Sequence, residues 1–441
     1  MTRQLYALLA SSTLASICTL CLLRRRARER AKRVADRASQ HVVDGPLIDT
    51  RDPVLRERIL QSAMKRASKW MAFRLGKSPT AMTGQVGGRA HDKAPILSLE
   101  PDYILKPVYA KEYRGLREVA FYESIELASH QNKSIQGEIL LETSEADDAK
   151  TSSRFLEYFD VLAMTLAILL RDPVVTGSET TLLASWKSVE QEIEVLRRLS
   201  LFTASYYGVV ENIQSPTDVG GCEEGREQLH HILLQDVTSS FRRPCVMDLK
   251  IGTQTYEPDS SLEKQDKERR KYGEHQTTFG FRMVGMRRYD PTHPDADQDG
   301  YLIWDKHYGR SLTTMETLVD AFTTFFQATS DGQNATVPEV RLKVVASVLG
   351  LVRSLRHRFE NNQCLAFYSS SLLIVYDAVA DTDYANLRMV DFGHVRRQAG
   401  GDVGYQHGLQ TLSSILLELL PNEPMSGSSS SLPERGRLLT V

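Results

Sequence analysis

The stretch Pro-Cys-Val-Met-Asp-Leu-Lys-Ile-Gly, residues 244–252, decides the fold that we expect for this chain. Its apolar residues predict a buried strand, and Asp248 and Lys250 lie two positions apart within it. Because successive side chains of a strand point to opposite faces, residues two apart share a face. A carboxylate beside an ammonium group suits a site that handles phosphate. The alternative is a buried strand with one salt-bridged edge.

Two more apolar segments lie downstream, FYSSSLLIVYD at residues 367–377 and RMVDFGH at residues 388–394. Both are rich in Leu, Ile and Val, and a polar turn over residues 380–386 separates them. This pattern predicts a β-hairpin. Elsewhere, apolar spacing predicts helices over 52–75 and 404–420, and a helix over 338–359 with a proline in its first turn.

These segments together resemble the inositol polyphosphate kinases. The chain carries the Pro-x-x-x-Asp-x-Lys-x-Gly signature of that family at residues 244–252. Residues 370–373 and 391–394 are similar to its Ser-Ser-Leu-Leu and Asp-Phe-Ala-His motifs, with Gly393 in place of Ala. Within the family, the segments that look most like the hexakisphosphate kinases are residues 85–88, 105–107, 121–123, 207–210, 280–289, 306–312 and 367–373.

The resemblance implies an α+β fold of two lobes, with an antiparallel sheet in each lobe and an ATP cleft between them. It covers about 82–130 and 200–421 and does not explain an insertion over 131–199. We expect five parts: a membrane anchor with a basic cluster (1–40), a helical linker (41–81), an N-terminal lobe that includes the helical insertion (82–243), a C-terminal lobe with the inositol phosphate site (244–421) and a disordered tail (422–441).

Phosphoryl transfer needs cations on the phosphates, a carboxylate for Mg²⁺ and a platform for adenine. By the resemblance, Lys106 binds the nucleotide phosphates and Glu118 is its ion-pair partner. Asp248 would hold the ribose hydroxyls. The hinge between the lobes, where adenine would bind, is formed by Gln235, Asp236 and Val237, and Gln235 stands where the family usually has Glu.

The resemblance also assigns the catalytic and metal-binding groups. Lys250 would bridge the transferred phosphate and the acceptor inositol, and Asp391 would bind Mg²⁺ from the end of a strand. Ser370 and Ser371 would orient the metal shell. For His394 we favour a supporting or core position over the role of a catalytic base.

The acceptor site is expected around a helix that follows the signature. Four basic residues, Lys264, Lys267, Arg270 and Lys271, fall at offsets of zero, three, six and seven, which places them on one face of a helix. The alternative is a solvated face neutralised by Glu263, Asp266 and Glu268. The expected substrate-binding residues are Pro244, Lys250, Gly252, Lys264, Lys267, Arg270 and Lys271.

The resemblance implies an ATP-dependent kinase that converts inositol hexakisphosphate to diphosphoinositol pentakisphosphate. The alternatives are an inositol polyphosphate multikinase, an inositol trisphosphate kinase and a non-catalytic inositol-phosphate-binding scaffold. A protein kinase is disfavoured. The chain has no Gly-x-Gly-x-x-Gly loop before Lys106 and no His-Arg-Asp segment before Asp391, so the base for the acceptor hydroxyl is missing.

Composition sets the remaining limits. The chain has 441 residues, 41% hydrophobic and 25% charged, with a net charge of −2, so no global charge favours nucleic acid as a partner. Its five cysteines are few and unpatterned, which fits a reducing compartment. We expect a monomer.

The amino-terminal run Leu5–Leu23 carries no charge and is followed by seven basic residues between Arg24 and Arg33. Its length is close to the roughly 20 residues that span a bilayer. The basic cluster predicts that the following residues stay in the cytosol. We therefore expect a membrane anchor with the catalytic lobes in the cytosol. An Arg-rich organellar presequence is the alternative.

Overall fold

The structure is a computed structural model. It describes residues 53–71, 79–82, 85–86, 95–99, 102–108, 115–126, 128–129, 186–211, 230–258, 260–329, 339–380, 382–398 and 400–421. The expected anchor over 5–23, most of the insertion and the tail over 422–441 lie outside these residues. Within the described part, no helix is both long enough and apolar enough to cross a membrane.

The first sheet has five antiparallel strands in the order β1-β2-β3-β5-β4. Helix α2 (Pro53–Met71) packs on β4. The approach is close, because a Cβ built at Gly208 of β4 would lie 2.3 Å from the carbonyl oxygen of Ala63. The strands are β1 (Thr80–Ala81), β2 (Leu97–Leu99), β3 (Tyr103–Val108), β4 (Tyr206–Glu211) and β5 (His230–Gln235).

The second sheet also has five antiparallel strands, in the order β11-β10-β6-β7-β8. The signature strand β6 is central, and five consecutive residues from its second to its sixth are buried. This burial explains why its sequence is apolar on both faces. The strands are β6 (Pro244–Ile251), β7 (Phe281–Tyr289), β8 (Tyr301–Trp304), β10 (Ser371–Asp377) and β11 (Ala385–Val390).

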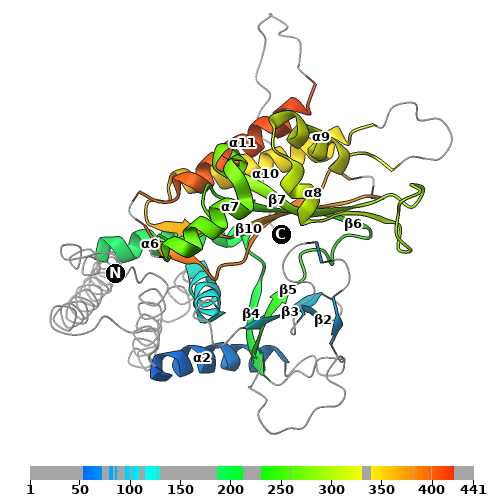
Figure 1. Ribbon diagram of the computed structural model, residues 1–441. Coiled ribbons are helices and arrows are strands. Elements are labelled where there is room, and N and C mark those ends of the chain that lie inside the picture. Colours follow the sequence, from blue (N-terminus) through cyan, green and yellow to red (C-terminus); the bar gives the residue numbers. More distant parts are fainter. Residues whose placement is uncertain are drawn as a thin grey trace, which may run out of the picture.

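Helices cover the second sheet on the side away from the first sheet (Figure 1). Helices α10 and α11 pack on each other and reach β11 and β6, while α8 and α9 contact β7. The bounds are α7 (Leu262–Phe279), α8 (Lys306–Ser311), α9 (Met315–Phe325), α10 (Leu342–Glu360) and α11 (Val403–Glu418). The remaining described elements are α6 (Trp186–Leu199), η1 (Ser200–Phe202), the helix over 115–126, and the short antiparallel pair β9 (Leu365–Phe367) and β12 (Val395–Arg397).

Two expectations from the sequence are confirmed directly. Each half of the described structure contains an antiparallel sheet, which gives an α+β fold. The predicted hairpin exists as β10 and β11, paired from Ser371 opposite Val390 to Tyr376 opposite Ala385.

The expected helix over 338–359 is wrong at its start. Helix α10 begins at Leu342, and Val340 forms a bridge with Gln327 instead. Directly before the helix, Arg341 is non-helical, with φ of −74° and ψ of 73°, and its guanidinium donates to the carbonyl oxygens of Asp377, Ala378 and Ala380. Periodicity cannot show such a long-range contact.

Candidate active site

The nucleotide-side lysine lies in the middle of the first sheet. Lys106 of β3 pairs with Ile232 of β5, and its side chain leaves the face opposite to that of Leu105. Its ammonium group donates to Oε1 of Glu118 over 2.7 Å and also to Oδ1 of Asp391. These two partners come from the helix over 115–126 and from the residue directly after β11. The three expected residues therefore meet.

The charges in this group set each other's protonation. Burial alone would lower the pKa of Lys106, but the negative charges of Asp391 and Glu118 outweigh it and raise that pKa. Burial alone would raise the pKa of Asp391, but Lys106 and Lys250 lower it to about 2. Asp391 is ionised at neutral pH, and its side chain is 42% exposed, so a ligand can reach it.

The signature pair lies on one face of β6, as the spacing predicts. Burial raises the pKa of Asp248 to about 6, against the opposing charge of Lys250. Burial likewise lowers the pKa of Lys250, although Asp391 and Asp248 oppose the shift. Within the described residues, Oδ1 of Asp248 is buried without a hydrogen-bond partner. Such an oxygen suits a bound donor such as a hydroxyl group.

The loop between β9 and β10 fixes the lysine. The ammonium group of Lys250 donates to the carbonyl oxygen of Ser369 over 2.8 Å and to its hydroxyl over 3.1 Å. Ser369 and Asp391 are the two described non-glycine residues with positive φ, 55° and 66°. Backbone of this kind is uncommon and clusters at functional sites. Two unusual backbone positions thus flank the signature pair.

The two predicted metal-shell serines are buried. The Ser370 hydroxyl donates to the carbonyl oxygen of Phe367 over 3.1 Å, and Ser371 lies beside the carboxylate of Asp248. Both hydroxyls have protein partners in this structure. Their role at the metal stays a prediction.

The expected hinge residues lie where the chain leaves the first sheet. β5 ends at Gln235, and the backbone N–H of Asp236 donates to the carbonyl oxygen of Asp102 over 2.7 Å. The carboxylate of Asp236 accepts from the backbone N–H and the hydroxyl of Thr238. The amide of Asn386 reaches the carbonyl oxygen of Val237. These contacts give the hinge a defined conformation.

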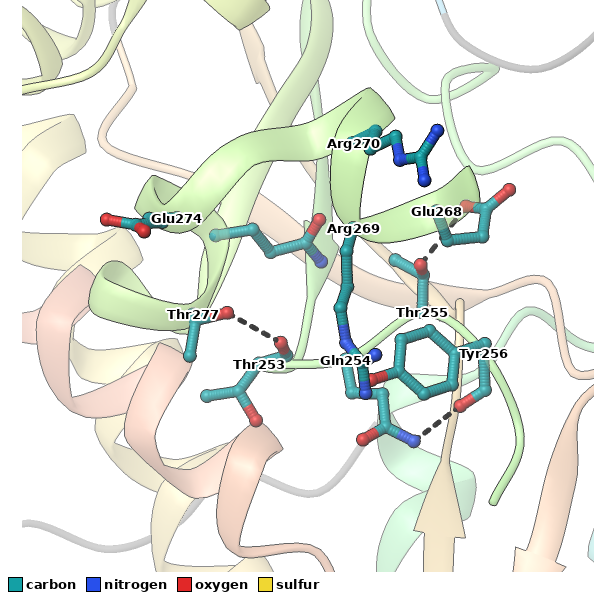
Figure 2. Close-up of a pocket in the computed structure, with 10 residues that line it drawn as sticks. Thr253, Gln254, Thr255, Tyr256, Glu268, Arg269, Arg270, Glu274 and Thr277 are labelled. Carbon is teal, nitrogen blue, oxygen red and sulfur yellow. Dashed lines mark hydrogen bonds between the residues drawn. The ribbon is translucent and has the colours of Figure 1, made fainter. Parts of the chain in front are cut away.

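A pocket of about 380 Å³ opens where β6 ends, between residues 253–256 and α7 (Figure 2). Gly252, with φ of 110°, turns the chain into this pocket, and its carbonyl oxygen accepts from Gln276. The guanidinium of Arg269 lies 5.3 Å from the ring centre of Tyr256. The lining residues are Thr253, Gln254, Thr255, Tyr256, Glu268, Arg269, Arg270, Glu274, Gln276 and Thr277.

The predicted substrate residues do not all meet. Arg270 lines the pocket, while Lys264 and Lys267 are exposed on α7 and do not line it. Lys271 lies within α7, but the position of its side chain is outside the described part. Pro244 begins β6 and pairs with Asp377, six residues before Lys250 and thus roughly 20 Å away along the strand.

Sequence reasoning missed Glu257. Its carboxylate accepts from Arg396 over 2.8 Å, contacts Nδ1 of His394 at 2.9 Å and pairs with Arg117. Glu257 lies in irregular chain between β6 and α7, where no periodic pattern could have indicated it. Its partners are more than 130 residues away in the sequence.

The described residues contain no cluster of three or more metal-ligating side chains. Proteins bind Mg²⁺ through one or two carboxylates together with substrate phosphates and water. The ionised, accessible carboxylate of Asp391 would supply one such ligand, and Lys106 and Lys250 beside it would face the phosphates.

Residues 231–417 match the family model for inositol polyphosphate kinase. The matched region contains the whole second sheet and all of β5 except His230.

Curated relatives agree. The chain is 34% identical over 183 residues to human inositol polyphosphate multikinase, a match over 42% of this chain and 38% of that protein. It is 29% identical over 229 residues to mouse inositol hexakisphosphate kinase 3, over 46% of this chain and 54% of that protein. The chain thus matches about half or less of the length of these relatives.

A solved structure that the chain resembles is the inositol phosphate multikinase Ipk2 from S. cerevisiae in complex with ADP and Mn²⁺. The TM-score is 0.40 at 20% identity, and the likeness covers 50% of this chain and 89% of that one.

Proposed function

We propose that this chain is an ATP-dependent inositol polyphosphate kinase that uses Mg²⁺. Its acceptor is inositol hexakisphosphate and its product is diphosphoinositol pentakisphosphate. One observation carries the proposal: Lys106, Glu118 and Asp391 meet from three separate segments, next to the Asp248–Lys250 pair. A scaffold that only bound inositol phosphates would have no need for an ionised, accessible carboxylate between two lysines.

Each residue has a role that follows from its position. Lys106, held by Glu118, binds the phosphates of the nucleotide. Lys250 stabilises the negative charge on the transferred phosphoryl group, and its contact with Ser369 fixes where that charge can lie. The free oxygen of Asp248 accepts from a ribose hydroxyl. Asp391 holds Mg²⁺, which neutralises phosphate charge when bound.

The pocket beside α7 is the proposed acceptor site. Its volume lies within the usual range for small-molecule sites, roughly 300–1,000 Å³. It begins three residues after Lys250, so an acceptor there lies close to the transferred group. Arg269 and Arg270 supply positive charge for phosphates.

A multikinase acceptor with fewer phosphates is the second candidate. Two observations favour it. Glu268 and Glu274 balance the two arginines of the pocket, and Thr253, Thr255 and Thr277 offer hydroxyl groups that suit free hydroxyls on the ring. Human inositol polyphosphate multikinase is also more similar per residue, at 34%, than mouse inositol hexakisphosphate kinase 3, at 29%.

The test is to incubate the purified protein with radiolabelled ATP, Mg²⁺ and a panel of inositol tris-, tetrakis-, pentakis- and hexakisphosphates. Products are separated by anion-exchange chromatography. A diphosphate from the hexakisphosphate supports the first candidate, and ring phosphorylation of a lower acceptor supports the second. The Asp391→Asn variant is the control for contaminating kinases. No transfer to any acceptor would overturn the proposed function.

A further inference from the structure

The carboxylate of Glu257 contacts three basic side chains from two segments that are distant in the sequence. Arg117 comes from the helix over 115–126, whereas His394 and Arg396 follow Asp391 in the chain. The side chain of Glu257 is only 12% exposed, and that of Arg396 only 6%. Removing one partner from a salt-bridge cluster as buried as this destabilises the folded protein, because a buried charge is left without compensation.

The charge of Glu257 is firmly held. Burial would raise its pKa, but the hydrogen bond with His394, the charge of Arg117 and the bonds of Arg396 outweigh burial and place the pKa far below its usual range. Glu257 is therefore a fixed anion at any physiological pH. Its partners are oriented by that charge.

Two consecutive residues of one helix hold the Asp391 loop from different sides. Glu118 contacts Lys106 and accepts from the backbone N–H of Phe392 at 3.4 Å. Its neighbour Arg117 binds Glu257, which in turn holds His394 and Arg396. The chain from Asp391 to Arg396 is thus bound at both ends.

Asp391 needs such support. Its backbone has φ of 66°, which costs a non-glycine residue energy and persists only where the surroundings impose it. The neighbouring residue Tyr256 lines the pocket beside α7, so Glu257 also joins the acceptor side to the loop. A shift of that loop would move the carboxylate of Asp391 relative to Lys106 and Lys250.

We infer that Glu257 is a positioning residue: its ion group with Arg117, His394 and Arg396 holds the Asp391 loop in the geometry that binds a divalent cation with the nucleotide. Glu257 acts through these partners and does not itself touch the cation or the nucleotide. The inference rests on the proposed function, because it takes Asp391 as the metal ligand.

The test compares Glu257→Gln with Glu123→Gln in the full chain. Glu123, on the helix that also carries Arg117, is a matched control. It accepts from Arg66 over 2.9 and 3.1 Å and from Tyr206 over 2.8 Å, and its side chain is 3% exposed. Both substitutions remove a buried anion with several donors. Of these two carboxylates, Glu257 contacts residues of the segment from Asp391 to Arg396, whereas the two partners of Glu123 lie outside that segment.

The measurement is binding of ADP with Mn²⁺, and of ADP in EDTA, by calorimetry. For Glu257→Gln we expect the dissociation constant of ADP with Mn²⁺ to rise about tenfold, as for residues that orient metal ligands. The constant in EDTA should stay within about twofold. Glu123→Gln should lower the melting temperature and leave both constants unchanged. Arg117→Gln, which removes one partner only, should raise the Mn²⁺-dependent constant by a smaller factor.

The outcomes separate the inference from the proposed function. A wild-type constant in Glu257→Gln, or an equal rise in Glu123→Gln, overturns the positioning role. If Glu257→Gln does not fold, an unchanged constant in Arg117→Gln overturns it instead. A wild-type protein that fails to bind ADP with Mn²⁺ overturns both proposals. Binding without transfer to any inositol phosphate overturns the acceptor assignment alone.

Discussion

The sheet around β3 presents one charged residue to the site, Lys106, whereas the sheet around β6 presents Asp248 and Lys250 from its central strand and Asp391 from the end of β11. The sheets also differ in their cores. One face of the first sheet packs a small cluster around Leu105 and Leu233, and its other face joins the large core that also contains the second sheet and the helices α9, α10 and α11. The second sheet carries more of the site.

The difference indicates that, in the proposed function, the second sheet acts mainly on the transferred phosphoryl group and the first sheet mainly on the nucleotide. Groups that act on the transferred phosphoryl group need fixed positions, and the buried central strand β6 holds Asp248 and Lys250. In the proposed function, the first sheet supplies Lys106, held by Glu118, as the cation for the nucleotide. Substitutions in the second sheet should therefore lower kcat, and substitutions on the first-sheet side should raise the KM for ATP.

Asp391→Asn should have the largest effect. It removes one negative charge at the proposed metal ligand without changing the volume, and we expect kcat to fall at least about a thousandfold at saturating Mg²⁺. The melting temperature measured alongside shows whether the fold survives. Near-normal turnover would show that Asp391 is not the metal ligand.

Lys250→Ala should lower kcat on the order of a hundredfold, because a charge on the transferred phosphoryl group is lost. The measurement is steady-state kinetics at saturating ATP and acceptor. A change in KM for ATP without a change in kcat would place Lys250 on the nucleotide side and would break the comparison between the two sheets.

Asp248→Asn should change how stability depends on pH. The native pKa of about 6 exceeds the unfolded value of about 3.9, so between these values the native state binds more protons than the unfolded state. Stability of the wild type should therefore fall by about 2 kcal/mol as the pH rises from 4 to 6. In the variant this contribution is lost. Urea unfolding at pH 4, 5 and 6 gives the two slopes, and parallel slopes would contradict the buried, protonated carboxyl group.

Glu118→Gln tests the first-sheet side. It weakens the hold on Lys106 while leaving Asp391 as a partner, so we expect the KM for ATP to rise about tenfold with kcat changed less than about threefold. Initial rates at varied ATP give both constants. A fall in kcat as large as that of Lys250→Ala would show that the two sheets do not divide the work.

Arg270→Ala should have the smallest effect of the five. Its side chain lines the pocket, and its loss should raise the KM for the inositol phosphate several-fold without changing the KM for ATP. Lys267→Ala is the matched comparison, because Lys267 is exposed on α7 and does not line the pocket. An equal rise in both variants would indicate that the acceptor contacts the whole basic face of α7 expected from the sequence, which includes Lys267 as well as Arg270.

The sequence by itself determined the elements whose signals are local. The alternation within residues 244–252 placed Asp248 and Lys250 on one face of a strand, and the apolar runs on either side of residues 380–386 indicated the hairpin of β10 and β11. Both signals depend on contacts within a few residues or on the period of a strand. The start of α10 was misplaced because Arg341 binds carbonyl groups about 36 residues away.

Only the tertiary structure decided which charges meet. Lys106 and Asp391 are 285 residues apart, and Glu257 lies 140 residues from Arg117 and 137 from His394. The resemblance assigned Lys106 and Asp391 to the nucleotide phosphates and the metal without predicting that they touch, and no motif indicated the contacts of Glu257. Glu257 stands in irregular chain, where a carboxylate has no period to reveal its face. Its role follows from burial and from the three basic groups that the fold brings to it, since an ion pair depends on distance in space and not on distance along the chain.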